Sequence, residues 1–286
     1  MTTREAQQKA QLQLKILYDE REAVNITDWV MEHITGKKRI DRLLDKQAML
    51  TTSQEVQLDT ILQELATHKP IQYVLGEAWF AGMKFLVNEH VLIPRPETEE
   101  LVDWIVGESK KSKIKNQKLL DIGTGSGCIP VSLKKLLPEF SVSSVDVSKE
   151  ALEVAQKNAA GLHADINFLH FDFLDQANWD QLPVVDIIVS NPPYIKQSEH
   201  GSMSKNVLDF EPSIALFVPD EDALLFYRKI ALFSKTHLSK GGSIFLEINE
   251  ALGKEIIELY ESNGYTIELR KDMQGKDRMA RIYHPR

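Results

Sequence analysis

Residues 118–128 read KLLDIGTGSGC, an apolar run that leads directly into three glycines at alternate positions, Gly123, Gly125 and Gly127. The run predicts a buried strand, and residues 128–137 predict the helix that follows it. Glycines at such a turn let the chain bend sharply and let a ligand approach main-chain N–H groups at a helix N-terminus. The spacing is G-x-G-x-G, which differs from the dinucleotide pattern G-x-G-x-x-G and therefore disfavours a nicotinamide or flavin ligand.

An acidic residue lies near the end of the next predicted strand, SVSSVDV. Asp146 comes 21 residues after Gly125. A carboxylate at this edge of a sheet can accept hydrogen bonds from both hydroxyls of an adenosine ribose. The alternative role is an N-cap for the helix that begins KEALEVAQ. Strand, glycine loop, helix, strand and terminal acid together predict a site for a nucleoside-containing ligand.

Apolar strand-like segments continue to alternate with amphipathic helical segments along the second half of the chain. This alternation implies an α/β fold, with a mostly parallel sheet that helices cover on both faces. The last two strand segments, residues 265–273 and 278–284, have no helix between them. We therefore expect an antiparallel hairpin at the end of the sheet.

The third predicted strand ends in Phe171, Asp172 and Phe173, at the edge where open α/β sheets bind ligands. An adenine ring could be held there, with Asp172 accepting a hydrogen bond from its exocyclic amine and Phe173 stacking on its face. Packing of both phenylalanines in the core is an equal alternative.

Residues 190–194 read SNPPY and follow the apolar run VDIIV. The two prolines stiffen the turn and remove two N–H donors, which leaves carbonyl oxygens free to accept. The Asn191 side-chain carbonyl and the Pro192 main-chain carbonyl could grip both hydrogens of a planar NH2 group, with Tyr194 over its face. The alternative is an ordinary proline-rich turn. In the context of this sheet, we interpret it as a site for an amide or an exocyclic amine.

The first 74 residues show helical periodicity and almost no strand pattern, which predicts a bundle of four or five helices. Ser53 is a plausible N-cap for one of them. The apolar residues that recur at spacings of three and four are Leu12, Ile16, Trp29, Ile34, Leu43, Leu44, Leu58, Ile61, Leu62 and Leu65.

Residues 75–95 are rich in aromatic and branched side chains around Ala81 and Gly82, a pair that could turn a hairpin. A helix is predicted to begin near Pro96. We therefore expect a helical domain at 1–74, a β-hairpin linker at 75–95 and a catalytic domain at 96–286.

Composition excludes several classes of protein. The 286 residues include 34 basic and 42 acidic ones, and the net charge of −8 argues against tight nucleic-acid binding. One cysteine forms no internal disulfide, and the polar start has no apolar stretch like that of a signal peptide. No apolar run is long enough to span a bilayer, and no histidine or cysteine pattern predicts a metal site. We expect a cytoplasmic protein without a metal.

The motifs resemble those of class I S-adenosylmethionine methyltransferases that carry NPPY. The chain as a whole resembles the HemK/PrmC family of protein-(glutamine-N5) methyltransferases, and the motifs that carry this resemblance run from about residue 69 to the end. IPRPETE, residues 93–99, is the most family-specific piece. The segments that carry the resemblance are YVLGEAWFAGMKFLV, VLIPRPETEELVDW, DIGTGSGCIPVSL, SNPPYI, FEPSIAL and DMQGKDR.

The resemblance implies a Rossmann-like, mostly parallel seven-stranded sheet with an antiparallel last strand, plus a small N-terminal all-α bundle. It implies methyl transfer from S-adenosyl-L-methionine, with S-adenosyl-L-homocysteine as the second product. The expected acceptor is the glutamine in the Gly-Gly-Gln loop of peptide chain release factors, which the helical module of this family is thought to help recognise. We expect a monomer.

The resemblance also assigns residues. Catalysis is expected from Asn191, Pro192 and Tyr194, and Pro193 joins them in binding the substrate. Two departures stand out, because the family often has Trp where Phe173 stands, and the segment after Glu247 lacks the usual Gly and Gln. With our own assignments of Asp172 and Asn191 included, the expected cofactor site comprises Gly123, Thr124, Gly125, Ser126, Gly127, Asp146, Asp172, Phe173 and Asn191.

Other functions stay open at this point. The sister enzyme that methylates a glutamine of a ribosomal protein shares the sheet motifs. Methylation of adenine or cytosine amino groups in nucleic acid conflicts with the acidic charge and the absence of a basic target-reading domain. A non-catalytic adenosine-binding scaffold conflicts with the intact Asn191 and Tyr194. Arg95 and Glu97 either cover the active site or belong to a rigid connector.

Overall fold

The computed structural model describes residues 1–111 and 116–285, which divide into two compact units. The first unit holds residues 1–77 and 204–210, and the second holds residues 78–203 and the chain from residue 211 onward. The sequence boundaries at residues 74 and 95 stay predictions. No helix in the described residues is both long enough and apolar enough to cross a membrane.

The first unit is helical, as expected. Thr51, and not Ser53, caps its fourth helix, because Thr51 Oγ1 accepts from the Gln54 N–H while the Gln54 side chain accepts from the Thr51 N–H. The prediction for Ser53 was therefore wrong. The helices are α1 (Thr3–Leu14), α2 (Glu20–Thr35), α3 (Arg39–Leu44), α4 (Thr52–Leu65), α5 (Ile71–Leu75) and, from later in the chain, α9 (Lys205–Phe210).

A two-stranded sheet follows α5. Strands β1 (Glu77–Phe80) and β2 (Met83–Leu86) are joined by Ala81 and Gly82. Both turn residues have positive φ, 48° and 72°, as the tightest hairpin turn requires. Helix α6 (Pro96–Lys111) then begins at the residue where the sequence predicted a helix.

The second unit contains a seven-stranded sheet in the order β10-β11-β9-β6-β3-β4-β5. All neighbours pair in parallel except β11, which is antiparallel to both β9 and β10, so the predicted sheet and its antiparallel last strand are confirmed. The chain runs outward from β3 to β5 and then returns to β6 on the other side of β3. Open sheets bind ligands where the order reverses in this way. The strands are β3 (Lys118–Ile122), β4 (Ser141–Asp146), β5 (Asn167–His170), β6 (Val185–Ser190), β9 (Leu238–Glu247), β10 (Thr266–Lys271) and β11 (Asp277–Tyr283).

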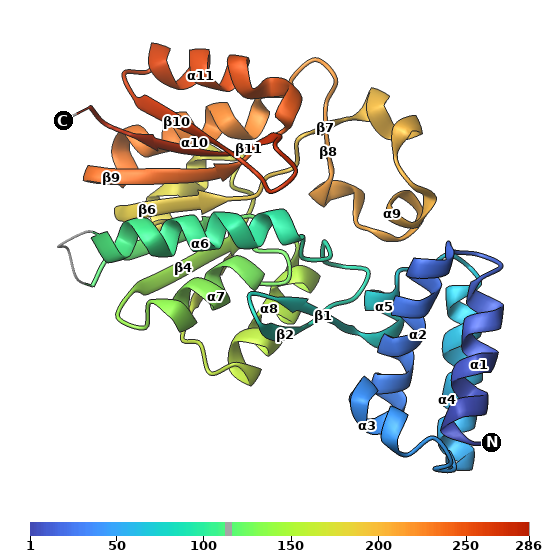
Figure 1. Ribbon diagram of the computed structural model, residues 1–286. Helices are drawn as coiled ribbons and strands as arrows, with labels where there is room; N and C mark the ends of the chain where they lie inside the picture. Colours follow the sequence, from blue (N-terminus) through green and yellow to red (C-terminus); the bar gives the residue numbers. More distant parts are fainter. Residues whose placement is uncertain (112–115, 286) are drawn as a thin grey trace. The chain divides into compact units, whose positions relative to one another are not determined.

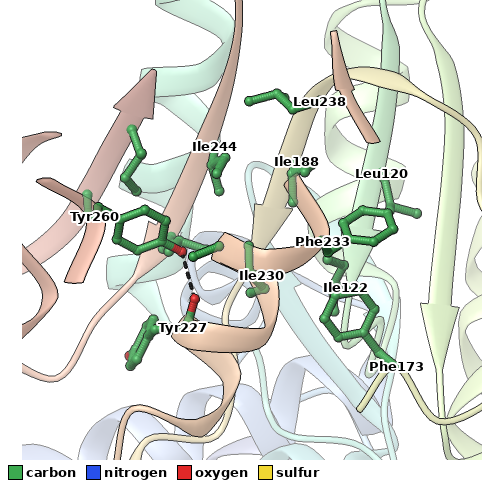
Figure 2. Packing of buried hydrophobic residues seen from close by; sticks show 14 of the residues in the cluster. Leu120, Ile122, Phe173, Ile188, Tyr227, Ile230, Phe233, Leu238, Ile244 and Tyr260 are labelled. Atoms are coloured by element: carbon green, nitrogen blue, oxygen red, sulfur yellow. Dashed lines mark hydrogen bonds between the residues drawn. The ribbon is translucent and has the colours of Figure 1, made fainter. Parts of the chain in front are cut away.

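Helices cover both faces of this sheet (Figure 1). Helix α7 (Cys128–Leu136) contacts both α6 and α8 (Lys149–Gly161), whereas α10 (Leu225–His237) contacts α11 (Gly253–Ser262). Successive strand residues alternate between two cores: Leu119 packs with the first group of helices and Leu120 with the second. Figure 2 shows the second core, where Tyr260 donates a hydrogen bond of 3.1 Å to the Tyr227 carbonyl. With both faces filled, the carboxyl edge of the sheet remains for a ligand.

Short elements connect the larger ones, and the sequence predicted none of them. Strand β7 (Ile195–Lys196) pairs in parallel with β8 (Phe217–Val218), and the Ile195 N–H donates to the Leu216 carbonyl at 3.0 Å. This pairing brings the FEPSIAL segment beside the end of SNPPY. The remaining short turns of 3-10 helix are η1 (Gln176–Gln181), η2 (Gln197–Ser202), η3 (Ser213–Ala215) and η4 (Glu250–Leu252).

Candidate active site

A pocket lies at the carboxyl edge of the sheet, where the strand order reverses between β3 and β6. The loop after β3, the end of β4 and the segments after β5 and β6 all contribute to its wall. The predicted site residues that line it are Gly123, Thr124, Gly125, Ser126, Asp146, Asp172, Phe173, Asn191 and Pro193. Gly127, Pro192 and Tyr194 are not among the lining residues, so the structure brings nine of the twelve predicted residues onto one surface.

Main-chain hydrogen bonds, two of them to β4, hold the glycine loop in place. The N–H groups of Gly123 and Thr124 both donate to the Val145 carbonyl, at 2.9 and 3.2 Å, and the Gly127 N–H donates to the Thr124 carbonyl at 2.9 Å. Gly123, Gly125 and Gly127 have φ values of 82°, 53° and 79°, which explains the choice of glycine. Because these N–H groups bond internally, the loop offers the pocket fewer donors than the sequence argument supposed.

Asp146 fastens the same loop at the end of β4. Its Oδ2 accepts from the Gly125 N–H at 2.8 Å, and its Oδ1 accepts from the Ser148 N–H at 2.9 Å. Burial raises the pKa of Asp146, and these backbone hydrogen bonds oppose that shift. Ser148 caps α8 by accepting from the Ala151 N–H, so the N-cap alternative for Asp146 was wrong. Each carboxylate oxygen keeps a further lone pair for a ligand.

A buried acid beneath the loop was not singled out by the sequence. Asp121 is fully buried, and its Oδ2 accepts from the Ser144 hydroxyl at 2.5 Å. The Thr124 hydroxyl bonds to the Ser144 oxygen in turn, so this chain fixes the Thr124 side chain. Burial, together with the smaller effect of the nearby Asp146 charge, raises the pKa of Asp121 to about 7 against the lowering effect of the Ser144 hydroxyl.

The segment after β5 combines core and pocket. Phe173 is 5% exposed, with ring centroids 5.6 Å from Trp179 and 5.3 Å from Phe233, so the core alternative is realised while the residue also lines the pocket. Asp172 is exposed, and its Oδ1 accepts from the Leu174 N–H at 2.8 Å. The predicted adenine contacts of both residues stay predictions.

Asn191 stands at the carboxyl end of β6. The preceding Ser190 hydroxyl donates to the Ile122 carbonyl at 2.6 Å, which ties this corner to the strand before the glycine loop. Asn191 Nδ2 donates to Thr98 Oγ1 at 3.2 Å. Within residues 1–111 and 116–285, no hydrogen-bond donor engages Asn191 Oδ1 or the Pro192 carbonyl. Both oxygens therefore lack a hydrogen-bond partner in the described part of the chain, although Pro192 is buried and does not line the pocket.

The described part of the chain gathers no group of three or more His, Cys, Asp or Glu side chains that could hold a metal ion. The expectation that the protein has no metal site stays a prediction.

Comparison with known proteins gives two family matches and several relatives. Residues 5–76 match the PrmC N-terminal domain, and residues 106–209 match the methyltransferase small domain. The chain is 48% identical over 271 residues to a release factor glutamine methyltransferase of Flavobacterium psychrophilum, covering 94% of each chain. The chain belongs to the release factor glutamine methyltransferase family. A second member, from Bacteroides thetaiotaomicron, is 43% identical over 267 residues, covering 93% of this chain and 94% of its own.

Solved structures agree on the fold. A methyltransferase from Pyrococcus furiosus is 19% identical, with a TM-score of 0.50, and covers 82% of this chain and 98% of its own. At this identity the likeness concerns the fold alone, and it matches the class I sheet described above.

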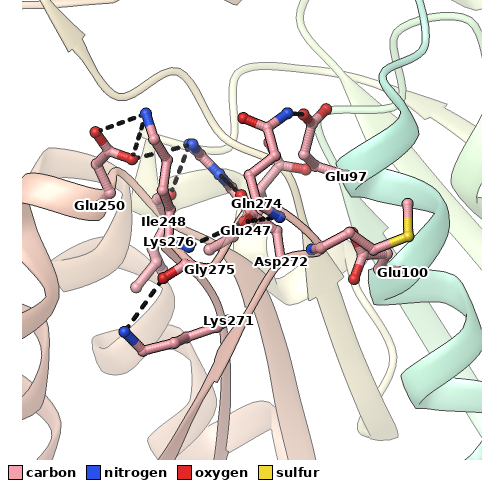
Figure 3. A network of polar contacts seen from close by, with 12 residues as sticks. Glu97, Glu100, Glu247, Ile248, Glu250, Lys271, Asp272, Gln274, Gly275 and Lys276 are labelled. Carbon is pink, nitrogen blue, oxygen red and sulfur yellow. Dashed lines mark hydrogen bonds and ion pairs between the residues drawn. The ribbon is translucent and has the colours of Figure 1, made fainter.

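The family-specific IPRPETE motif contributes contacts that the sequence left unassigned. Arg95 pairs with Glu211 of FEPSIAL at 2.6 Å, and the Ile93 N–H donates to the same carboxylate at 3.2 Å. Glu97 accepts from the Gln274 side chain at 3.2 Å, in the loop between β10 and β11 that Figure 3 shows. Arg95 lines the pocket, whereas Glu97 is tied to this loop.

Thr98 and Glu247 are the polar residues that sequence reasoning missed. The Thr98 hydroxyl donates to Glu247 Oε2 at 2.6 Å, and the Tyr194 hydroxyl donates to Glu247 Oε1 at 3.3 Å. Burial, followed by the negative charge of Glu247, raises the pKa of Tyr194 well above its ordinary value, so the phenol stays protonated. The sequence signal that could have found Glu247 is an acidic residue at the end of an apolar strand.

Proposed function

We propose that this protein transfers the methyl group of S-adenosyl-L-methionine to the side-chain amide nitrogen of the glutamine in the Gly-Gly-Gln loop of peptide chain release factors. The observation that carries this proposal is the pair of acceptors that lack a partner in the described residues, Asn191 Oδ1 and the Pro192 carbonyl, in a corner whose prolines have no N–H group. A primary carboxamide has two hydrogens to offer such a pair. Relatives at 42–48% identity are named for this reaction.

The pocket fits the proposed methyl donor. An added Cβ at Gly123 or Gly125 would meet nothing within 4 Å, so the loop leaves open space above it. Ser126 also lines this space, and its buried side chain lies beside the Cys128 thiol. The lone pairs of Asp146 suit ribose hydroxyls. When bound, S-adenosyl-L-methionine supplies a methyl group on a positively charged sulfur.

The protein's own residues then work by placement. An amide nitrogen is a weak nucleophile because its lone pair is delocalised, and SNPPY offers no basic side chain. Asn191 Oδ1 and the Pro192 carbonyl would accept the two amide hydrogens, aim the nitrogen at the methyl carbon and stabilise positive charge as it develops on nitrogen. The nitrogen forms the new N–C bond as the S–C bond breaks, and afterwards it loses one proton to water. The products are N5-methylglutamine and S-adenosyl-L-homocysteine.

We extend the proposal to a monomer that works in the cytoplasm on a protein substrate and binds nucleic acid only weakly. The net charge of −8 supports the last point. The remaining alternative that uses the same reaction is methylation of a glutamine in a ribosomal protein.

One experiment separates these substrates. The protein is incubated with radiolabelled S-adenosyl-L-methionine and, separately, a purified bacterial release factor, ribosomal proteins or DNA, and mass spectrometry then locates the modified residue. We expect label on the release factor, at the glutamine of its Gly-Gly-Gln loop. Label on a ribosomal protein or on DNA, with none on the release factor, would replace this proposal with the corresponding alternative.

A further inference from the structure

Two buried residues outside SNPPY hold both of its polar side chains. Asn191 Nδ2 donates to Thr98 Oγ1 at 3.2 Å, and the Thr98 hydroxyl donates to Glu247 Oε2 at 2.6 Å. The second oxygen, Glu247 Oε1, accepts from the Tyr194 hydroxyl at 3.3 Å. Thr98 and Glu247 are each 2% exposed. The Glu247 carboxylate is therefore linked to Asn191 through Thr98 and to Tyr194 directly.

The chemistry of these groups fixes the direction of the longer chain. An ionised carboxylate can only accept, so the Thr98 hydroxyl must give its single hydrogen to Glu247. The Thr98 oxygen can then only accept from Asn191, and Nδ2 is the end of the Asn191 amide that donates. The opposite end, Oδ1, is left facing away from Thr98.

We propose that Thr98 and Glu247 are positioning residues that make Asn191 present its carbonyl oxygen, and not its NH2 group, to the substrate carboxamide. This inference rests on the proposed function and deepens it. The two ends of an asparagine amide are nearly equal in size, so shape alone does not choose between them. With the NH2 end turned to the substrate, two donors would face each other, and the acceptor that orients the substrate nitrogen would be lost.

The surroundings of Glu247 act on its charge in opposite directions. Burial raises the pKa of Glu247, while the Thr98 hydroxyl and the positive charge of Arg278 lower it. Asp272 holds Arg278 in place through a contact of 3.3 Å to its Nε, in the loop network of Figure 3. The Tyr194 hydroxyl lowers the pKa of Glu247 further. The pKa of Glu247 stays above its ordinary value, so the hydrogen bonds and the nearby cation offset the cost of the buried charge only in part.

The test compares Thr98→Val, which keeps the shape and removes the hydroxyl, with Thr98→Ser, which keeps the hydroxyl. Thr27→Val is the matched control, because Thr27 is also buried and, within the described residues, its hydroxyl bonds only to the Ala23 carbonyl of its own helix. We measure kcat with a purified release factor, Kd for S-adenosyl-L-homocysteine by calorimetry, and the 15N-labelled NH2 signals of Asn191, identified by their loss in Asn191→Ala.

We expect Thr98→Val to lower kcat by about 10- to 100-fold and to shift the Asn191 NH2 signals, with Kd changed by less than about threefold. Thr98→Ser should keep kcat within about threefold of wild type, and Thr27→Val should leave it unchanged. Unchanged Asn191 signals in Thr98→Val, or equal loss of kcat in the Ser and Val variants, would overturn the inference. If wild type methylates no release factor, the proposed function fails, and the Asn191 signals still decide whether Thr98 sets the amide.

Discussion

The two sides of the pocket are built in different ways. On the glycine-loop side, the hydrogen bonds of Asp121, Thr124 and Asp146 all join residues within 23 positions of one another. On the SNPPY side, Asn191 depends on a residue 93 positions away, and Thr98 and Glu247 are 149 positions apart. The first side is a local motif, while the second is assembled by the fold. Changes on the first side should therefore affect ligand affinity and stability, and changes on the second should affect turnover.

The strongest test of this division is Asn191→Ala. It removes the side-chain acceptor and the donor to Thr98, so the transition state should lose about 1.5 to 3 kcal/mol or more. This corresponds to a fall of roughly 10- to 100-fold or more in kcat, with little change in cofactor affinity. Steady-state kinetics with a release factor measures the first quantity, and calorimetry with S-adenosyl-L-homocysteine measures the second. If Asn191→Ala keeps a normal kcat and binds the cofactor weakly, Asn191 acts in cofactor binding, as the glycine-loop side does, and not in turnover.

On the glycine-loop side, a substitution that strains the backbone should lower the stability of the fold. A Cβ added at Gly127 would lie 3.1 Å from the Ala155 Cβ, at a φ of 79° that side chains rarely adopt. Gly127→Ala should therefore lower the free energy of unfolding by about 2 kcal/mol, measured by urea denaturation.

Gly123→Ala is the matched control, because Gly123 has a φ of 82° and a Cβ there would meet nothing within 4 Å. It should show only the conformational cost of about 1 kcal/mol. Equal losses in the two variants would mean that packing of the loop against α8 contributes nothing.

Asp146→Ala should weaken the binding of S-adenosyl-L-homocysteine by about tenfold, or about 1.4 kcal/mol, since it removes the ribose acceptors and frees the Gly125 N–H. Asp146→Asn keeps one carbonyl acceptor and should give an intermediate Kd. Turnover at saturating cofactor should change much less than in Asn191→Ala. Calorimetry that finds the same Kd for all three proteins would remove Asp146 from the proposed cofactor site.

The contrast between local and long-range contacts also explains which features could be predicted from the sequence. The mostly parallel sheet, its last hairpin and the place of Gly125 beside Asp146 follow from patterns within 30 residues, because neighbouring elements meet at one sheet edge, whereas the count of seven strands came from the family resemblance. Thr98 was missed because its partners lie far along the chain, and no local pattern links a helix's first turn to the end of a ninth strand. The sequence identified IPRPETE as specific to the family, but the contacts that its residues make could be seen only in the structure.

In the helical unit, the prediction from sequence was limited in a different way. Leu12 and Ile16 helped to set the helical periodicity, yet they are 69% and 82% exposed. The buried face of α1 consists instead of Thr3, Ala6, Ala10 and Leu14, at spacings of three and four. Small residues allow close helix packing but carry a weak apolar signal. Spacing therefore predicted the buried face of α4, which consists of Leu58, Ile61, Leu62 and Leu65, but not the buried face of α1.

The smallest expected effect concerns the charge beneath the glycine loop. Burial raises the pKa of Asp121 to about 7 from an ordinary value near 3.8. The folded chain therefore binds this proton more tightly than the unfolded chain, and its stability falls as the pH rises through the window between these values. Between pH 6 and pH 8 the loss from this one group is about 1 kcal/mol.

Asp121→Asn removes the charge, and its amide oxygen can still accept from the Ser144 hydroxyl. The free energy of unfolding of the variant relative to wild type should therefore rise by about 1 kcal/mol from pH 6 to pH 8, measured by urea denaturation at each pH. Other titrating groups, including the eight histidines, are common to both proteins and cancel in the difference. Parallel curves would show that Asp121 does not change its protonation state between pH 6 and pH 8, which would contradict this prediction.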